Sequence, residues 1–122
     1  SCTMTAELED HSTPLRAITF IESHTGSEYR FLGARVLENG DLLIEGQDIG
    51  STAEELYGER EFEYEVRVAA EHVPAVLLWL LKERFVTQAL TSQGFSLQGF
   101  TSTVDLRRWL DEHHIPSQFA TY

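Results

Sequence analysis

The dipeptide Asn39-Gly40 places the strongest constraint on how this chain folds. It lies between two largely apolar runs, residues 29–38 and 41–49. Asn-Gly accepts the positive φ angles of a type I′ turn, whose twist matches that of two paired strands. The sequence therefore predicts that these two runs form an antiparallel hairpin.

Two other segments are typical of strands, and a third is expected at one edge of the sheet. Residues 15–22 are rich in β-branched and aromatic side chains and precede a turn at 24–27. Residues 61–68 alternate strictly, which predicts a half-buried strand. Its apolar row is Phe62, Tyr64, Val66 and Val68, and its charged row is Glu61, Glu63, Glu65 and Arg67. Residues 117–122 are expected to add the edge strand.

A short helix is expected between the third and fourth strands. Ser51 or Thr52, with Glu54 or Glu55 three residues later, forms a capping box. Gly58 would end the helix, because glycine favours the left-handed conformation found after a helix C-terminus.

Residues 73–87 are predicted to form a long helix, since Pro74 suits a first turn and apolar residues follow at helical spacing. Leu78 and Trp79 make the apolar band wider than a single stripe. We therefore expect this helix to be buried on two sides, by the sheet and by a second helix or a second subunit, and a dimer could form through it. A turn-rich connection is expected over residues 88–100.

A second principal helix is predicted to begin at Ser102, with Asp105 completing a capping box. It would place one apolar face toward the core, made of Leu106, Trp109, Leu110 and His113. Ile115-Pro116 would end it, because proline cannot continue a helix.

These elements predict a single α+β domain over residues 15–122. We expect a mostly antiparallel sheet of four to five strands with two principal helices packed on one face. A chain of 122 residues that is 42% hydrophobic can bury one core without disulfides or a structural metal. Residues 1–14 are expected to be a mobile tail. The single cysteine, Cys2, cannot form an internal disulfide, which favours a cytoplasmic location.

Negative charge is concentrated in one part of the chain. Residues 38–65 contain ten acidic side chains and one basic side chain, so this stretch carries −9 of the total net charge of −11. Glu54, Glu55 and Asp41 are explained by helix capping and by the turn. The remaining candidates for a partner-binding surface are Glu45, Asp48, Glu59, Glu61, Glu63 and Glu65, with Tyr57 as an aromatic anchor.

Several classes of function are disfavoured by the same sequence. Direct binding to nucleic acid or to an anionic membrane needs clustered Lys and Arg, which a net charge of −11 does not provide. Glycine-rich nucleotide loops and nucleophile elbows are absent, so no catalytic residue is assigned. His113 and His114 are adjacent and point apart on a helix, so no metal site and no cofactor is expected.

One resemblance covers about residues 29–116. The segment from Leu37 to Gly50, the triplet Glu63-Tyr64-Glu65, the Val73-Pro74 helix and the stretch from Trp109 to Pro116 resemble small acidic bacterial proteins. Some of these look like immunity proteins of toxin–immunity systems. The resemblance implies an inhibitor role and brings no set of site residues with it.

The leading hypothesis is a non-enzymatic binding protein that neutralises a basic partner such as a nuclease-type toxin. It would place carboxylates where the partner binds phosphates, because complementary charge speeds association. Two alternatives stay open. One is a DNA-mimic inhibitor of a nucleic-acid-processing enzyme, with charges spaced like phosphates, and the other is a small enzyme or ligand-binding domain with an apolar pocket.

Overall fold

The computed structural model of the chain describes residues 14–92 and 99–122. The predicted tail with Cys2, and the part of the predicted connection that falls on 93–98, lie outside the described residues. The side chains of Tyr57 and of residues 86–92 are also outside them.

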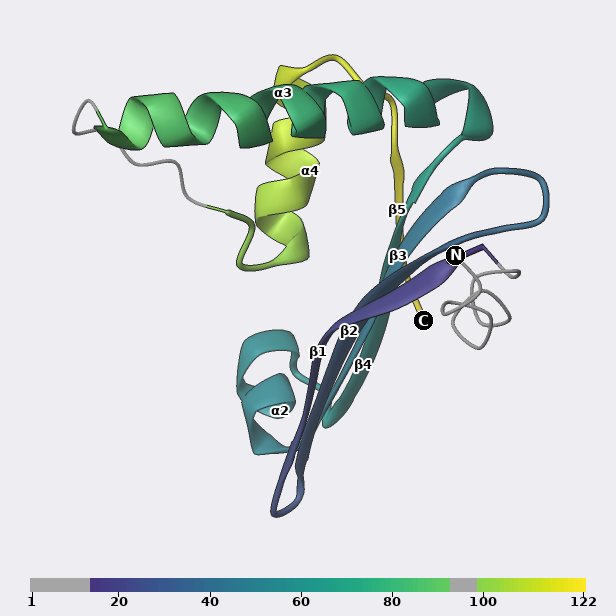
Figure 1. Cartoon of the computed structure of the whole chain (residues 1–122). Helices are drawn as coiled ribbons and strands as arrows, with labels where there is room; N and C mark the ends of the chain where they lie inside the picture. Colours follow the sequence, from purple (N-terminus) through teal and green to yellow (C-terminus); the bar gives the residue numbers. More distant parts are fainter. Residues whose placement is uncertain (1–13, 93–98) are drawn as a thin grey trace, which may run out of the picture.

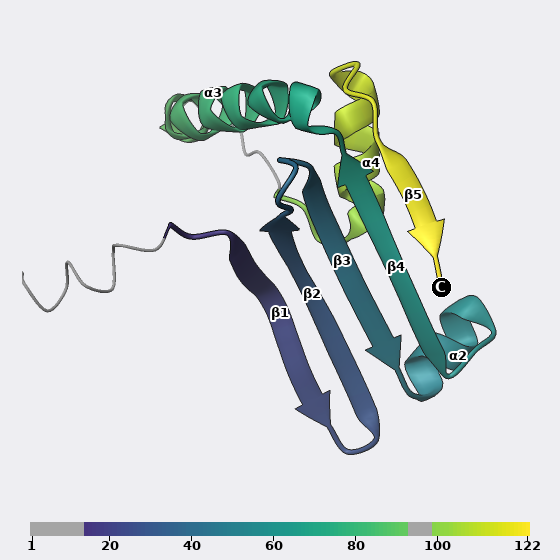
Figure 2. The same ribbon diagram turned by 90° about the vertical axis from the view of Figure 1, so that its right-hand side faces the viewer.

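Five strands form one antiparallel sheet in sequence order, β1-β2-β3-β4-β5 (Figures 1 and 2). The strands are β1 (Ala17–Thr25), β2 (Glu28–Val36), β3 (Leu42–Ile49), β4 (Glu61–Val68) and β5 (Gln118–Thr121). The predicted hairpin is β2 with β3, and the predicted edge strand is β5. The α+β class and the antiparallel sheet are therefore confirmed.

The helices lie on one side of this sheet (Figure 1). They are α2 (Ser51–Tyr57), the single 3₁₀ turn η2 (Ala70–His72), α3 (Val73–Ser92) and α4 (Thr103–Glu112). The two principal helices, α3 and α4, are where the sequence predicts them. However, α3 continues past its predicted end at residue 87 and takes in part of the predicted turn-rich connection.

The turn between β2 and β3 is not of type I′. Gly40 has a φ of 94°, but Asn39 is not among the described residues with positive φ. The Gly40 amide donates to the Leu37 carbonyl over 2.9 Å, and the Leu37 amide donates to the Asp41 carbonyl over 2.9 Å. This is a loop of three residues whose last residue is left-handed, a hairpin connection that needs positive φ at glycine only.

The N-terminus of α2 is capped from a distant strand. The predicted capping box is wrong, because the N-cap is Gly50 and no side chain of the helix caps it. Glu28 of β2 accepts hydrogen bonds from the Ser51 amide (2.7 Å), the Ser51 hydroxyl (2.8 Å) and the Thr52 amide (3.2 Å). These hydrogen bonds lower the pKa of Glu28 from 4.5 to about 2. The predicted end of α2 is confirmed, since Gly58 is left-handed with a φ of 82°.

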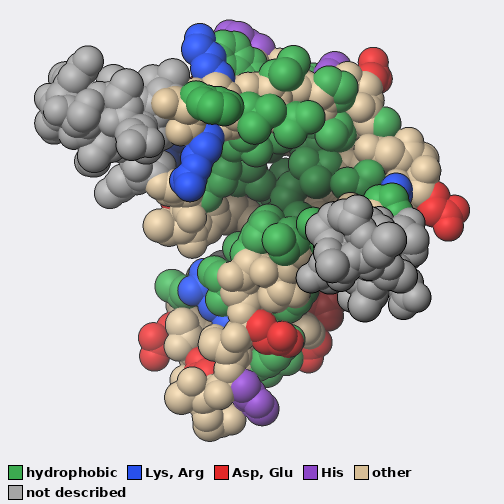
Figure 3. Space-filling view, viewed as in Figure 1, with side chains coloured by type: hydrophobic (Ala, Val, Ile, Leu, Met, Phe, Trp, Pro, Cys, Tyr) green, Lys and Arg blue, Asp and Glu red, His purple; other side chains and the backbone are tan. Residues whose placement is uncertain are grey.

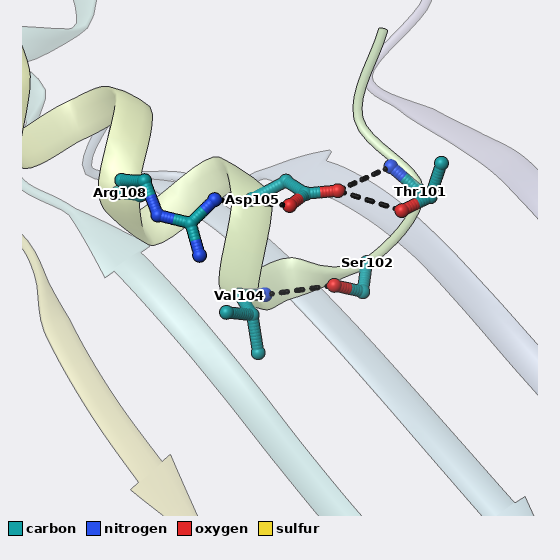
Figure 4. A network of polar contacts seen from close by, with 5 residues as sticks. All are labelled: Thr101, Ser102, Val104, Asp105 and Arg108. Carbon is teal, nitrogen blue, oxygen red and sulfur yellow. Dashed lines mark hydrogen bonds and ion pairs between the residues drawn. The ribbon is translucent and has the colours of Figure 1, made fainter. Parts of the chain in front are cut away.

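The N-terminus of α4 is capped locally (Figure 4). The Ser102 hydroxyl accepts from the Val104 amide over 3.2 Å. Asp105 accepts from the amide and the hydroxyl of Thr101, at 3.0 and 2.6 Å, and these bonds lower the pKa of Asp105. Asp105 also lies 3.4 Å from Arg108. The predicted start of this helix is confirmed, although the main contacts of its acidic residue are with Thr101 and the hydrogen bond from the Ser102 amide is a minor one.

The core lies between the sheet and α4. Leu110 and Val66 are fully buried, and Trp109 is 7% exposed. The Tyr64 ring occupies the place that a side chain at Gly46 would take, because a Cβ there would overlap it. The predicted apolar row of β4 therefore faces the helices. The other buried members of this core are Leu32, Ile44, Val68, Val76 and Ile115.

Within the described part of a single chain, α3 is not buried on two sides, and burial by a second subunit stays a prediction. Among its described apolar side chains, Val76 packs on the core, together in part with Val73 and Ala75. Leu78 is 64% exposed and Trp79 is 38% exposed. The helix extends past the edge of the sheet instead of lying along it (Figures 1 and 2), so one of its apolar sides has nothing in the described chain to cover it.

Candidate functional site: the open face of the sheet

The sheet has a second side on which none of the described helices lies, and Figure 2 looks toward this side. Successive strand residues alternate between the two sides. Because Tyr64 and Val66 face the helices, Glu63 and Glu65 face the other way, as do the residues paired with them. We call this side the open face. Its charged residues are Glu22, Arg35, Glu45, Glu61, Glu63, Glu65 and Arg67, and its aromatic residues include Tyr29 and Phe31.

Strand pairing brings the carboxylates of two strands together. Glu45 of β3 lies directly opposite Glu65 of β4, and Gln47 lies opposite Glu63. Directly opposed side chains have Cβ atoms about 4.5–5.5 Å apart, and like charges in that position destabilise a sheet. The open face therefore holds an acidic cluster that opposes folding by its own repulsion.

Neighbouring side chains compensate this charge only in part. Arg35 Nε lies 2.8 Å from Glu45 Oε2, but both side chains are substantially exposed, so the ion pair contributes little stability. Gln47 Nε2 donates to Glu63 over 3.2 Å and to Glu61 over 3.4 Å. These amide contacts satisfy carboxylate oxygens without neutralising them.

Tyr122, just after β5, adds an aromatic ring to the acidic cluster. Its amide donates to the Glu63 carbonyl over 2.9 Å. Its hydroxyl donates to Glu65, and this hydrogen bond is the main reason why the pKa of Tyr122 is raised. With Phe31, Tyr122 lines an open depression of about 380 Å³ that also includes Glu45, Glu63 and Glu65. Carboxylates next to partly exposed aromatic rings suit a protein interface, because the rings supply apolar contact area.

The predicted partner-binding residues do not all reach this surface. Glu45, Glu61, Glu63 and Glu65 lie on the open face. Asp48 lies on the helix side, 3.7 Å from Arg30, because residues an odd number apart on a strand point to opposite sides. Asp48, one of the predicted partner-binding residues, is therefore not part of the open face.

The last two predicted partner-binding residues, Tyr57 and Glu59, lie at the C-terminus of α2 and in the turn that follows it. Glu59 is exposed between α2 and β4. Tyr57 ends α2, and its side chain lies outside the described residues. Neither is part of the open face as described.

Sequence reasoning missed several residues of this surface, among them Phe31, Gln47 and Tyr122. Gln47 is two residues from Glu45, so strand alternation could have placed it. Phe31 and Tyr122 could be placed only once the pairing of β2 with β3 and of β4 with β5 was known.

Two other features, a metal site and a membrane-spanning helix, are not found among residues 14–92 and 99–122. No group of three or more His, Cys, Asp or Glu side chains there is arranged to hold a metal ion. None of the helices formed by these residues combines the length and the apolar character that a membrane span requires.

No protein family, no curated protein and no solved structure matches this chain. The assignment of function therefore depends on the chemistry of the open face.

Proposed function

We propose that this protein is a non-enzymatic binding protein whose open face binds a basic protein partner. One observation carries the proposal. Four glutamates of β3 and β4 share a sheet surface that no described helix covers, with Glu45 directly opposite Glu65. A basic surface that covers such a cluster relieves the repulsion among the glutamates. Binding to a basic partner therefore gives this arrangement a function.

Two properties of the open face fit this role. Its net charge, with the rest of the acidic chain behind it, would steer a basic partner and accelerate association by about 10- to 1,000-fold. Its aromatic residues, Phe31, Tyr29 and Tyr122, would then supply contacts that slow dissociation. Tyr29 is held in place by a hydrogen bond of 3.1 Å to Glu22.

The partner we propose is a nuclease-type toxin, which this protein would inhibit as an immunity protein. A nuclease binds phosphates through clustered Lys and Arg, and such a cluster is the surface that a group of carboxylates complements.

A stopped-flow binding experiment tests the proposal. The partner would be a basic nuclease domain, starting with any nuclease encoded beside this protein's gene. The triple variant Glu61→Gln, Glu63→Gln and Glu65→Gln should slow association about tenfold or more at low salt and flatten its dependence on salt concentration. Inhibition of the nuclease should weaken in parallel.

A matched variant removes the same charge elsewhere. Glu55→Gln, Glu71→Gln and Glu112→Gln change three exposed glutamates on α2, η2 and α4. This control should keep most of the wild-type association rate. If both triple variants slow binding equally, only net charge matters and the open face is not the site. If neither variant changes the rate, the proposal fails.

A further inference from the structure

Besides the acidic open face, the protein has an exposed apolar surface on α3. Leu77, Leu78, Leu81 and Phe85 are 55%, 64%, 46% and 81% exposed. They are spaced by one, three and four residues, which places them on one side of a helix. We call these four residues the α3 stripe. In Figure 3, hydrophobic side chains gather along α3 and around the hollow below it.

The opposite side of α3 already has its contacts. Val76 is 5% exposed in the core, and Glu83 accepts a hydrogen bond of 2.7 Å from the indole nitrogen of Trp109 on α4. The Trp79 ring lies 4.6 Å from the His113 ring. One side of α3 therefore already packs on the core and on α4. Another molecule could cover the α3 stripe on the other side without moving the helix.

The exposed apolar area is large for a surface with no partner. An aromatic side chain has an area of about 150–250 Å², and a leucine has somewhat less. The four residues of the α3 stripe are between 46% and 81% exposed, which amounts to roughly 400 Å². A contiguous apolar patch of this size on a soluble protein is often an interaction site.

The part of the chain that carries the α3 stripe has no net charge, unlike the rest of the protein. Residues 73–122 contain four basic and four acidic side chains, so the helical part is neutral and the remaining 72 residues carry the net charge of −11. Two copies of so acidic a chain repel each other at most surfaces, but not at this one. The basic members are Lys82, Arg84, Arg107 and Arg108, and the acidic members are Glu83, Asp105, Asp111 and Glu112.

We propose that a second copy of this chain covers the α3 stripe in a two-fold symmetric dimer. A two-fold interface uses the same patch on both copies, and an apolar stripe complements itself. Exposed Arg84, seven residues after Leu77, borders the stripe. Lys82 does not intrude on the stripe, since its ammonium group lies 5.2 Å from the centre of the Trp79 ring. The helices lie on the opposite side of the sheet from the open face (Figure 1), so dimerisation leaves both open faces free.

Sedimentation velocity over a range of protein concentrations tests this proposal. The wild-type protein should pass from monomer to a species of twice the mass as concentration rises. The double variant Leu78→Glu and Phe85→Glu should remain monomeric at all concentrations, because it places two carboxylates in the stripe. Both residues are exposed in the monomer, and circular dichroism would verify that the variant keeps its fold.

A matched control places the same charge on another helix. Val104 on α4 is 55% exposed, and Val104→Glu should leave the dimer unchanged. A wild-type protein that stays monomeric up to several hundred micromolar would overturn the proposal and leave the stripe to a different occupant. Persistence of the dimer in the double variant would overturn it as well, because the interface would then lie elsewhere.

Discussion

The open face and the α3 stripe are both exposed to solvent, but they expose opposite chemistry. The open face has five glutamates against two arginines, while the α3 stripe contains no charged residue. The glutamates repel one another in the folded monomer, and the leucines of the stripe expose apolar area to water. Each surface therefore has a physical reason to be covered, and the two reasons point to different partners.

The supports of these surfaces also differ. The open face is built on β2, β3 and β4, whose backbones are paired along their length. The α3 stripe belongs to a helix that is joined to the core by its first turns and by the contacts of Glu83 and Trp79. A rigid sheet keeps carboxylates in fixed positions, whereas α3 depends on a few side chains for its orientation.

The largest difference in stability is expected between replacing a buried leucine of α4 and replacing an exposed leucine of the α3 stripe. Leu110→Ala removes a fully buried side chain of α4 and should lower the free energy of unfolding by about 2–5 kcal/mol. Leu78→Ala, in dilute protein, should change it by less than about 0.5 kcal/mol. Urea denaturation measures both. Similar losses for the two variants would mean that the α3 stripe is buried within the monomer.

The attachment of α3 should depend on the hydrogen bond between Glu83 and Trp109. Glu83→Ala leaves a buried indole N–H without this acceptor and should lower the free energy of unfolding by about 1–3 kcal/mol. Glu83→Gln keeps an acceptor oxygen and should restore most of the loss. Tryptophan fluorescence would follow the environment of Trp109. Equal effects of Ala and Gln would show that the charge near His113, 3.4 Å away, is what matters.

A smaller, pH-dependent effect is expected where Glu28 caps α2. The pKa of Glu28 is about 2 in the folded protein, against an ordinary value of 4.5. The carboxylate therefore contributes its full stabilisation above about pH 4.5 and loses it as the pH falls toward 2. Glu28→Gln should lower the melting temperature at pH 7 and leave a smaller difference from wild type near pH 2. If the melting temperatures of wild type and Glu28→Gln differ by the same amount at both pH values, the Glu28 carboxylate is not the cap of α2.

Sequence alone predicted most of the sheet and half of the candidate site. The alternation over β4 placed Glu61, Glu63 and Glu65 on one side because a strand has a period of two residues. The same rule, applied to β3, would have separated Glu45 from Asp48. Pairing registers such as that of β4 with β5, which brings Tyr122 to Glu65, depend on contacts between distant segments that no local pattern contains.

Other differences arise because local signals have more than one structural solution. Ser51 and Glu54 fit a capping box, but Glu28, 23 residues earlier, satisfies the same amide groups. The leucines of α3 fit a helix buried on two sides, and an apolar stripe has the same sequence whether the covering surface belongs to its own chain or to another. The fold of a single chain cannot distinguish these cases.

We propose that the open face keeps its carboxylates for binding and at a cost in stability. Glu65→Gln removes the charge opposite Glu45 and leaves an oxygen that can accept from Tyr122. In the free protein it should raise the free energy of unfolding by about 0.2–1 kcal/mol at low salt, and the gain should shrink at 1 M salt. Glu55→Gln on α2 is the control for the change in net charge.

Urea denaturation of these two variants at both salt concentrations is the most direct measurement. Glu65→Gln should stabilise the protein more than Glu55→Gln does, and 1 M salt should suppress the difference. A loss of stability, or no difference between the two variants, would show that Glu65 supports the fold or is merely solvated, and that its charge does not oppose folding.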